Sequence, residues 1–228
     1  MQIVLVSSPG TGQAPHWSTA LAGEFAREVA AKGATVRWLV ALHAADAAPP
    51  GGDGVQVLPF RERRPSPLSE VAASQSDAAM ELALTESLRA APESVVVHVG
   101  LGGQGTPNML WLADRLGSRT FACARGAELV CHRGDLLDRD QRVCREWLDA
   151  ERCRWCCTTS WRSKPRADDL RNRQDLLIAA LHTCAAIAVP ADEDVEMLSS
   201  LGVASSRVSV GASAEALAAL VVGAASAS

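Results

Sequence analysis

The sequence contains no apolar run that approaches the roughly 20 residues a membrane-spanning helix needs. It opens with Met1-Gln2 and a strand-like run from Ile3 to Val6, without the basic region typical of a signal peptide. The charge is not one-sided either, because the formal net charge is -4 and the pI is near 5.7. We therefore expect a cytoplasmic protein with no membrane span and no nucleic-acid partner.

Several signatures of catalytic and cofactor sites are also missing. The turn Gly10-Thr11-Gly12 lacks the third glycine of the dinucleotide fingerprint, and no acidic residue closes the second predicted strand. Neither a nicotinamide nor a flavin cofactor is therefore predicted. There is no Walker loop, no Gly-x-Ser-x-Gly elbow and no His-Glu-x-x-His. The acidic groups at 168–169 and 192–194 begin predicted helices, where the helix dipole explains them without catalysis.

Apolar residues make up 48% of the 228 residues, enough to bury a substantial core. Predicted strands cover residues 3–6, 35–42, 55–60, 95–99, 119–124, 185–189 and 207–210. Predicted helices lie between them at 17–31, 69–91, 108–116, 168–182, 192–201 and 214–222. This alternation predicts an α/β fold, a three-layer, Rossmann-like and mostly parallel sheet with helices on both faces. We expect one domain over 1–222, with a Cys-rich insertion at 125–166 and a flexible tail at 223–228.

Ligands of such sheets bind at the carboxyl ends of the strands. Here three stretches lie at such ends: 7–16, 98–105 and 125 onward. Glycines in these stretches let backbone amides approach a ligand. The candidate ligand-binding residues are Gly10, Thr11, Gly12, His16, His98, Gly102, Gly103, Arg125 and Glu128. The alternative is an ordinary strand-to-helix turn at the first glycines and a buried core histidine at position 98.

Cysteines form the most specific local signal. The pair Cys153 and Cys156 is a CxxC, the commonest half of a tetrahedral zinc site, and Cys131 and Cys144 precede it. The intervening residues are mostly charged and cannot bury a core of their own, so a metal would give them order. We predict a zinc site on these four residues, with His132 and Cys157 as substitute ligands. Reduced thiols, or a redox disulfide at the CxxC, remain the alternatives. Cys123 and Cys184 lie in apolar contexts and are predicted core thiols.

With this order established, the chain resembles the N-terminal, acceptor-side domain of family-4 glycosyltransferases. The stretch from Leu129 to Asp140 is similar to a Leu-Leu-Cys-Pro-Arg-Gly-x-Leu-Leu stretch of one subgroup, and the later cysteines resemble those of that subgroup. Val96-Val97-His98 resembles the strand that ends in His midway through the domain. The segment from Asp175 to Val210 resembles the end of the domain. The resemblance implies two Rossmann-like domains with a cleft between them, the second binding a nucleotide diphosphate-sugar.

Two departures from the family bear on activity. Arg125-Gly126 stands where the family has a His-Asp pair whose His assists catalysis, and Arg cannot act as a base at neutral pH. Arg125 remains suited to an acidic or phosphorylated group. The sequence also shows no donor-binding domain and no pair of Glu that such a domain would carry.

These features leave three hypotheses. The first is a degenerate or half enzyme, a pseudoenzyme when alone, that binds an acceptor-like ligand and works with a separate donor-domain subunit or as a homo-oligomer. The second is a metal-ordered binding or scaffolding protein without glycan chemistry. The third, a complete small transferase, has the least support because no acid-base pair is visible.

Overall fold

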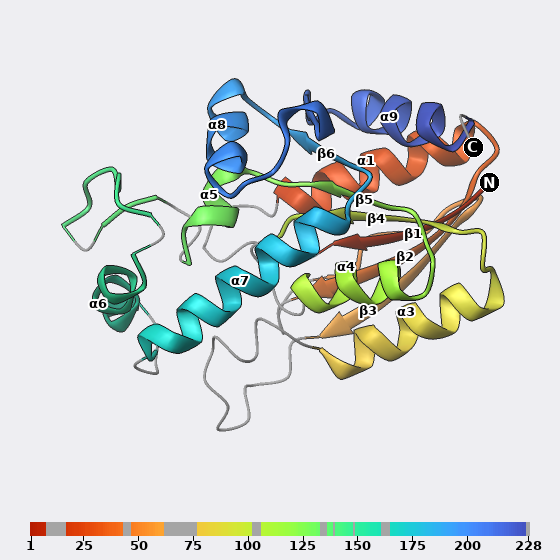
Figure 1. Cartoon of the computed structure of the whole chain (residues 1–228). Helices are drawn as coiled ribbons and strands as arrows, with labels where there is room; N and C mark the ends of the chain where they lie inside the picture. Colours follow the sequence, from red (N-terminus) through yellow and green to blue (C-terminus); the bar gives the residue numbers. More distant parts are fainter. Residues whose placement is uncertain are drawn as a thin grey trace.

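The fold is a single parallel sheet covered by helices, seen in a computed structural model (Figure 1). The structure describes residues 1–7, 17–42, 47–61, 77–101, 106–132, 136–138, 140–147, 149–160 and 165–226, without the side chains of 61, 106, 158–160, 225 and 226. The strands are β1 (Gln2–Ser7), β2 (Thr35–Leu42), β3 (Val55–Arg61), β4 (Val95–Val99), β5 (Thr120–Cys123), β6 (Ala186–Val189) and β7 (Val208–Val210). Their order in the sheet is β3-β2-β1-β4-β5-β6-β7, and every neighbouring pair is parallel. The predicted Rossmann-like α/β fold is therefore confirmed.

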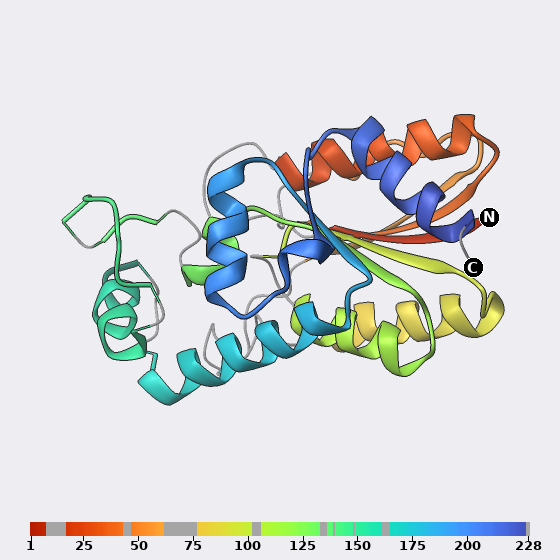
Figure 2. The same cartoon turned by 45° about the horizontal axis from the view of Figure 1, so that its top comes forward.

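Helices cover both faces of this sheet (Figure 2). They are α1 (Trp17–Ala31), α3 (Ala78–Ala90), α4 (Thr106–Arg115), α5 (Gly126–Val130), α6 (Ala150–Ser160), α7 (Ala167–Thr183), α8 (Asp192–Ser200) and α9 (Ala214–Ser226), and Ser205–Arg207 forms a 3-10 turn. α1 and α9 pack on one face, and α3 and α4 pack on the other. α7 and α8 extend the cover over β5 and β6. None of the described helices is long and apolar enough to cross a membrane.

The period-two pattern of the strands explains why both faces are buried. Ile3 and Leu5 of β1 point into the core beneath α1 and α9, whereas Val4 and Val6 point into the core beneath α3 and α4. All four side chains are fully buried. A strand that is apolar at every position suits only a sheet covered on both sides, which is why the continuous apolar runs predicted the layers correctly.

The strand order reverses next to β1, since β2 lies on one side of it and β4 on the other. The carboxyl ends of β1 and β4 therefore meet at the switch point, with Ser7 paired to Val99 and Val6 paired to His98. Ligands of open α/β sheets bind at this edge. The fold thus places the carboxyl ends of β1, β4 and β5 at one edge of the sheet.

The predicted helix over 69–91 is wrong in its extent. α3 begins at Ala78, because Asp77 is in an extended conformation and its carboxylate accepts hydrogen bonds from the amides of Ala79 and Met80. The proposed cap at Ser69 lies outside the described residues. Pro92 follows the end of the helix as expected.

The insertion at 125–166, predicted to be irregular, contains two helices. α5 has five residues, too few for a helical pattern to be visible. α6 carries charged and cysteine residues in place of an apolar stripe, so its sequence gave no amphipathic signal. The predicted flexible tail is helical up to Ser226, because α9 continues beyond Val222.

Close packing of α5 against α8 requires glycine at position 126. The Gly126 amide donates a 2.6 Å hydrogen bond to Asp194 Oδ1. A Cβ at this position would lie 2.7 Å from both Asp194 Oδ1 and Met197 Sδ, and 3.1 Å from Asp194 Cα. Gly126 is therefore tightly packed, since a side chain there would displace the side chains of Asp194 and Met197 and press on the backbone of α8.

We predict that Gly126→Ala lowers the free energy of unfolding by about 1–3 kcal/mol, because the new methyl group overpacks the contact with α8. Gly223→Ala is the matched control: this helical glycine is exposed with no atom near its Cβ position. It should be neutral or stabilise by up to about 1 kcal/mol. Urea unfolding of both variants measures the difference, and equal effects would contradict the packing constraint.

Candidate functional site

Glu128 anchors a polar cluster at the carboxyl edge of the sheet. It lies on α5 directly after β5, with 5% of its surface exposed. Its Oε1 accepts a 2.9 Å hydrogen bond from Trp17 Nε1, and its Oε2 accepts a 3.2 Å bond from the Leu101 amide. One carboxylate therefore joins the start of α1, the segment after β4 and α5.

Arg125 completes this cluster on its exposed side. Its guanidinium carbon lies 4.7 Å from the centre of the Trp17 ring, which is a cation-π contact. Trp17 is half-buried between Arg125 and Glu128. Sequence reasoning missed the role of Trp17. The available signal was its position at the start of the helix that follows the glycine-rich turn.

Burial raises the pKa of the Glu128 carboxyl above its ordinary value. The hydrogen bonds from Trp17 and Leu101, together with Arg125, oppose this rise without cancelling it. A buried carboxyl with a raised pKa at a ligand-binding edge is characteristic of functional sites.

His98 lies on β4 at the switch point and is fully buried. Within the described part of the chain, neither of its ring nitrogens has a hydrogen-bond partner of normal geometry. Burial lowers the pKa of His98 to about 3, and the backbone of Gly100 opposes this shift weakly. The imidazole is therefore neutral at physiological pH and could accept or donate one hydrogen bond.

The structure brings Arg125 and Glu128 together and places His98 on the neighbouring strand end. The other predicted ligand residues lie outside the described residues: Gly10, Thr11, Gly12, His16, Gly102 and Gly103.

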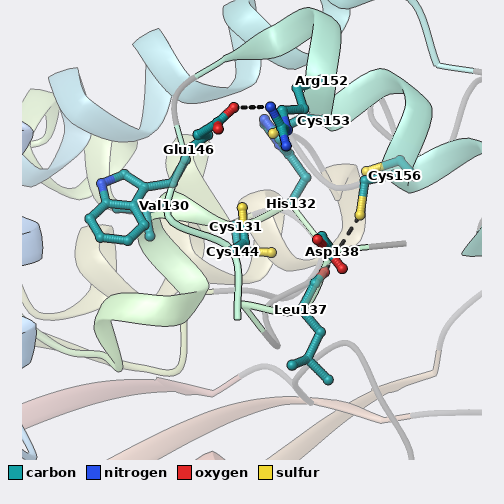
Figure 3. Close-up of a pocket in the computed structure, with 12 residues that line it drawn as sticks. Val130, Cys131, His132, Leu137, Asp138, Cys144, Glu146, Arg152, Cys153 and Cys156 are labelled. Carbon is teal, nitrogen blue, oxygen red and sulfur yellow. Dashed lines mark hydrogen bonds and ion pairs between the residues drawn. The ribbon is translucent and has the colours of Figure 1, made fainter. Parts of the chain in front are cut away.

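The four predicted metal ligands line one small pocket beside α5 and α6 (Figure 3). The pocket is partly open and has a volume of about 30 Å³. Its lining residues include Cys131, Cys144, Cys153 and Cys156, and also His132 and Cys157. All seven cysteines of the chain carry thiols and form no disulfide.

Three separate segments supply these cysteines. Cys131 follows α5, and Cys144 follows a short antiparallel bridge between Leu137 and Val143. Cys153 and Cys156 lie one turn apart on α6. Burial raises the pKa of Cys153 to about 12, and the other three cysteines, followed by Asp149, add to this rise. The sequence spacing therefore identified residues that converge in space.

A buried arginine lies behind the cysteine pocket. Arg173 of α7 is 3% exposed, and its Nη1 lies 3.5 Å from His132 Nδ1. Burial lowers the pKa of Arg173, while Cys157, Cys131 and Glu128 favour its charged form. Burial, and then the charge of Arg173, lower the pKa of His132 to about 3.

As the side chains stand, no three His, Cys, Asp or Glu residues of the described ranges meet the geometry of a metal site. The zinc prediction therefore remains a prediction. The prediction for Cys123 and Cys184 is confirmed, because both thiols are buried in the main core.

A larger cavity of about 360 Å³ lies at the opposite edge of the sheet. It is lined by Gln2, Thr35 and Val55, and each of them is the first residue of a strand. It is therefore at the amino ends of β1, β2 and β3, away from the edge where parallel sheets bind ligands.

No protein-family model matches the chain, and no curated protein sequence matches it. Solved structures with a similar fold include UGT2 of Phytolacca americana complexed with UDP-2-fluoro-glucose and pterostilbene. The two sequences are 14% identical, and the match covers 89% of this chain and 51% of that chain with a TM-score of 0.46. A UGT transferase from Siraitia grosvenorii in complex with UDP has 14% identity, coverage of 91% and 50%, and a TM-score of 0.47. A Medicago truncatula UGT complexed with UDP-glucose has 11% identity, coverage of 88% and 48%, and a TM-score of 0.48. The likeness concerns the fold, and the chain spans about half the length of these structures.

We predict that His98→Leu makes the protein less sensitive to acid. The pKa of His98 falls from an ordinary 6.5 to about 3 on folding, so the unfolded chain takes up a proton that the folded chain cannot. As pH falls from 6.5 towards 3, this histidine should remove up to about 1.4 kcal/mol of unfolding free energy per pH unit. Urea unfolding at several pH values measures the slope, which should be smaller in the variant. An unchanged slope would contradict the burial of a neutral imidazole.

Glu128→Gln tests the raised pKa of the carboxyl. Below its unfolded pKa near 4.5, Glu128 is protonated in both states and its contribution to stability is complete. As pH rises through its higher folded pKa, that contribution is lost. The stability of the parent relative to Glu128→Gln should therefore decrease as pH rises above about 4.5. Glu215→Gln removes the same charge from the exposed face of α9 and controls for net charge. A constant difference between parent and Glu128→Gln would refute the shift.

Proposed function

We propose that this chain is the acceptor-side domain of a family-4-type glycosyltransferase, degenerate or catalytically incomplete by itself. The proposal rests on the Glu128 carboxylate at the carboxyl edge of the sheet. It accepts hydrogen bonds from Trp17 and Leu101, and Arg125 stacks on the same Trp17 ring. A polar cluster of this kind at a strand-order switch is suited to holding a ligand. The family itself rests on the sequence resemblance.

Arg125 is the residue best placed to contact the ligand. It is exposed, and stacking on Trp17 restricts its orientation, so less conformational freedom is lost when it binds. A guanidinium of fixed orientation suits a bidentate contact with a carboxylate or phosphate. We infer an acceptor that carries an acidic or phosphorylated group.

The same cluster argues against sugar transfer by this domain alone. Arg125 takes the position of the family's catalytic His and cannot remove a proton at neutral pH. Glu128 directs both carboxylate oxygens at donors within the protein. The described residues therefore offer no general base at the exposed side of the cluster, and transfer would need a donor-binding domain, in this polypeptide or in a partner.

A second candidate function is a metal-ordered binding protein without glycan chemistry. The pocket shared by Cys131, Cys144, Cys153 and Cys156 favours it. The two candidates differ in their ligand, since the second requires no recognition of a sugar at Arg125.

We predict that the domain binds a phosphorylated sugar better than the neutral sugar, and that Arg125→Ala removes the difference. Saturation-transfer NMR with glucose 6-phosphate and glucose as matched probes measures it. Loss of charge-assisted bonds should weaken binding roughly 10-fold to 100-fold. Arg115→Ala is the matched control, because Arg115 also stacks on a tryptophan, Trp111, at 5.0 Å, on α4. Equal binding of both sugars, or equal loss in both variants, would overturn the acceptor-side proposal.

An activity assay separates an incomplete enzyme from a complete one. The purified chain with UDP-glucose should release no UDP above the buffer rate, with or without glucose 6-phosphate. Affinity capture from the source cells should recover a protein with a sugar-nucleotide-binding domain. Release of UDP by the chain alone, lost on Glu128→Gln, would establish a complete transferase instead.

A further inference from the structure

We propose that one zinc-like divalent metal ion is bound in the cysteine pocket, by the four thiolates of Cys131, Cys144, Cys153 and Cys156. Four sulfur ligands form a closed tetrahedral shell, so the role of the ion is structural. This proposal does not depend on the proposed glycosyltransferase function.

The pair on α6 has the geometry of half a metal site. Cys153 and Cys156 are three residues apart on a helix, which places both sulfurs on one face. The start of this helix is fixed by Asp149, whose carboxylate accepts hydrogen bonds from the amides of Glu151 and Arg152. The first turn, which carries Cys153, is therefore held in place.

The segment before α6 brings the third cysteine to the same place. Asp138 closes a tight turn by accepting hydrogen bonds from the amides of Asp140 and Arg142. The Cys144 amide then donates a 2.7 Å bond to the Leu136 carbonyl. Cys156 Sγ lies 3.5 Å from the carbonyl of the adjacent Leu137, so the turn and α6 meet at the pocket (Figure 3).

The size of the cavity selects the class of ligand. Its volume of about 30 Å³ is large enough for a single ion or a water molecule. Small-molecule sites are roughly ten times larger, which excludes a sugar or nucleotide here. A single ion is of a suitable size. As the side chains stand, no three His, Cys, Asp or Glu residues of the described ranges meet the geometry of a metal site, so binding would require the cysteine side chains to change rotamer.

A buried cation lies beside the cysteine pocket. Arg173 is a buried cation that lies near Cys131 and Cys157. A divalent ion with four thiolates has a net negative charge, which compensates a buried guanidinium better than neutral thiols do. Because His132 Nδ1 is beside the Arg173 guanidinium, we assign His132 and Cys157 to this arginine and not to the metal.

The surroundings of α6 provide little other stabilisation. Its buried apolar cluster consists of Ala150, Ala167 and Leu170, with Cys153 packed against it. α6 and the turn before it stand away from the sheet in Figure 1. An ion would supply the order that a core this small cannot.

Elemental analysis of the full chain, purified without a His tag, tests the proposal. We expect about one equivalent of zinc per chain. Removal of the metal by a chelator should make Cys131, Cys144, Cys153 and Cys156 reactive towards a thiol reagent in the otherwise native protein. Less than about a tenth of an equivalent of metal, with these thiols reactive from the start, overturns the proposal. A disulfide between any two of them, found by mass spectrometry after alkylation, also overturns it.

Variants identify the ligands. Cys153→Ser with Cys156→Ser should lose the metal, whereas Cys184→Ser, in the main core, and Cys157→Ser should retain it. Because loss of the metal can unfold a variant, cobalt(II) added to the chelator-treated parent chain provides an independent readout. Tetrahedral thiolate coordination gives intense visible bands and sulfur-to-cobalt charge transfer, and their absence would contradict the proposed shell. Retention of metal by the double variant would assign the ion to other ligands.

Discussion

The Glu128 carboxylate holds together three segments that are far apart in the sequence. Trp17, at the start of α1, and Leu101, after β4, both donate to it, and Glu128 itself lies on α5 after β5. These segments are the ones that a parallel sheet brings to its carboxyl edge, so the strand order places them within reach and the carboxylate fixes their relative positions. Removing water from this carboxylate is unfavourable, and the two N–H donors compensate for part of that cost.

The sheet could be predicted from the sequence because strands buried on both faces are continuous apolar runs. Runs such as Ile3 to Val6 have no polar face, and glycines at positions such as 33 and 202 end the helices in the left-handed conformation. The sequences of α5 and α6 show no such apolar pattern. Their position depends on contacts with distant residues, such as Asp194 for α5, and on cysteines in place of an apolar stripe.

The candidate site was predictable in part for the same reason. Arg125 and Glu128 follow a predicted strand, so topology alone placed them at the edge. The hydrogen bond from Trp17 to Glu128 joins residues 111 positions apart, and no local pattern encodes it. The cysteines were predictable in part. Their spacing indicated that they form one site, whereas their position beside the buried Arg173 could be seen only in the structure.

Gly126 limits which residues the start of α5 can carry. A sequence that carried the family's His-Asp pair here would need an aspartate where even a methyl group meets Asp194 and Met197. Substitution of Arg125 and Gly126 by such a pair would therefore also displace the Asp194 and Met197 side chains. The backbone of α8 would also have to move by a few tenths of an ångström, because Asp194 Cα lies 3.1 Å from the Cβ position. The packing of α5 against α8 therefore favours glycine at position 126, whatever residue stands at position 125.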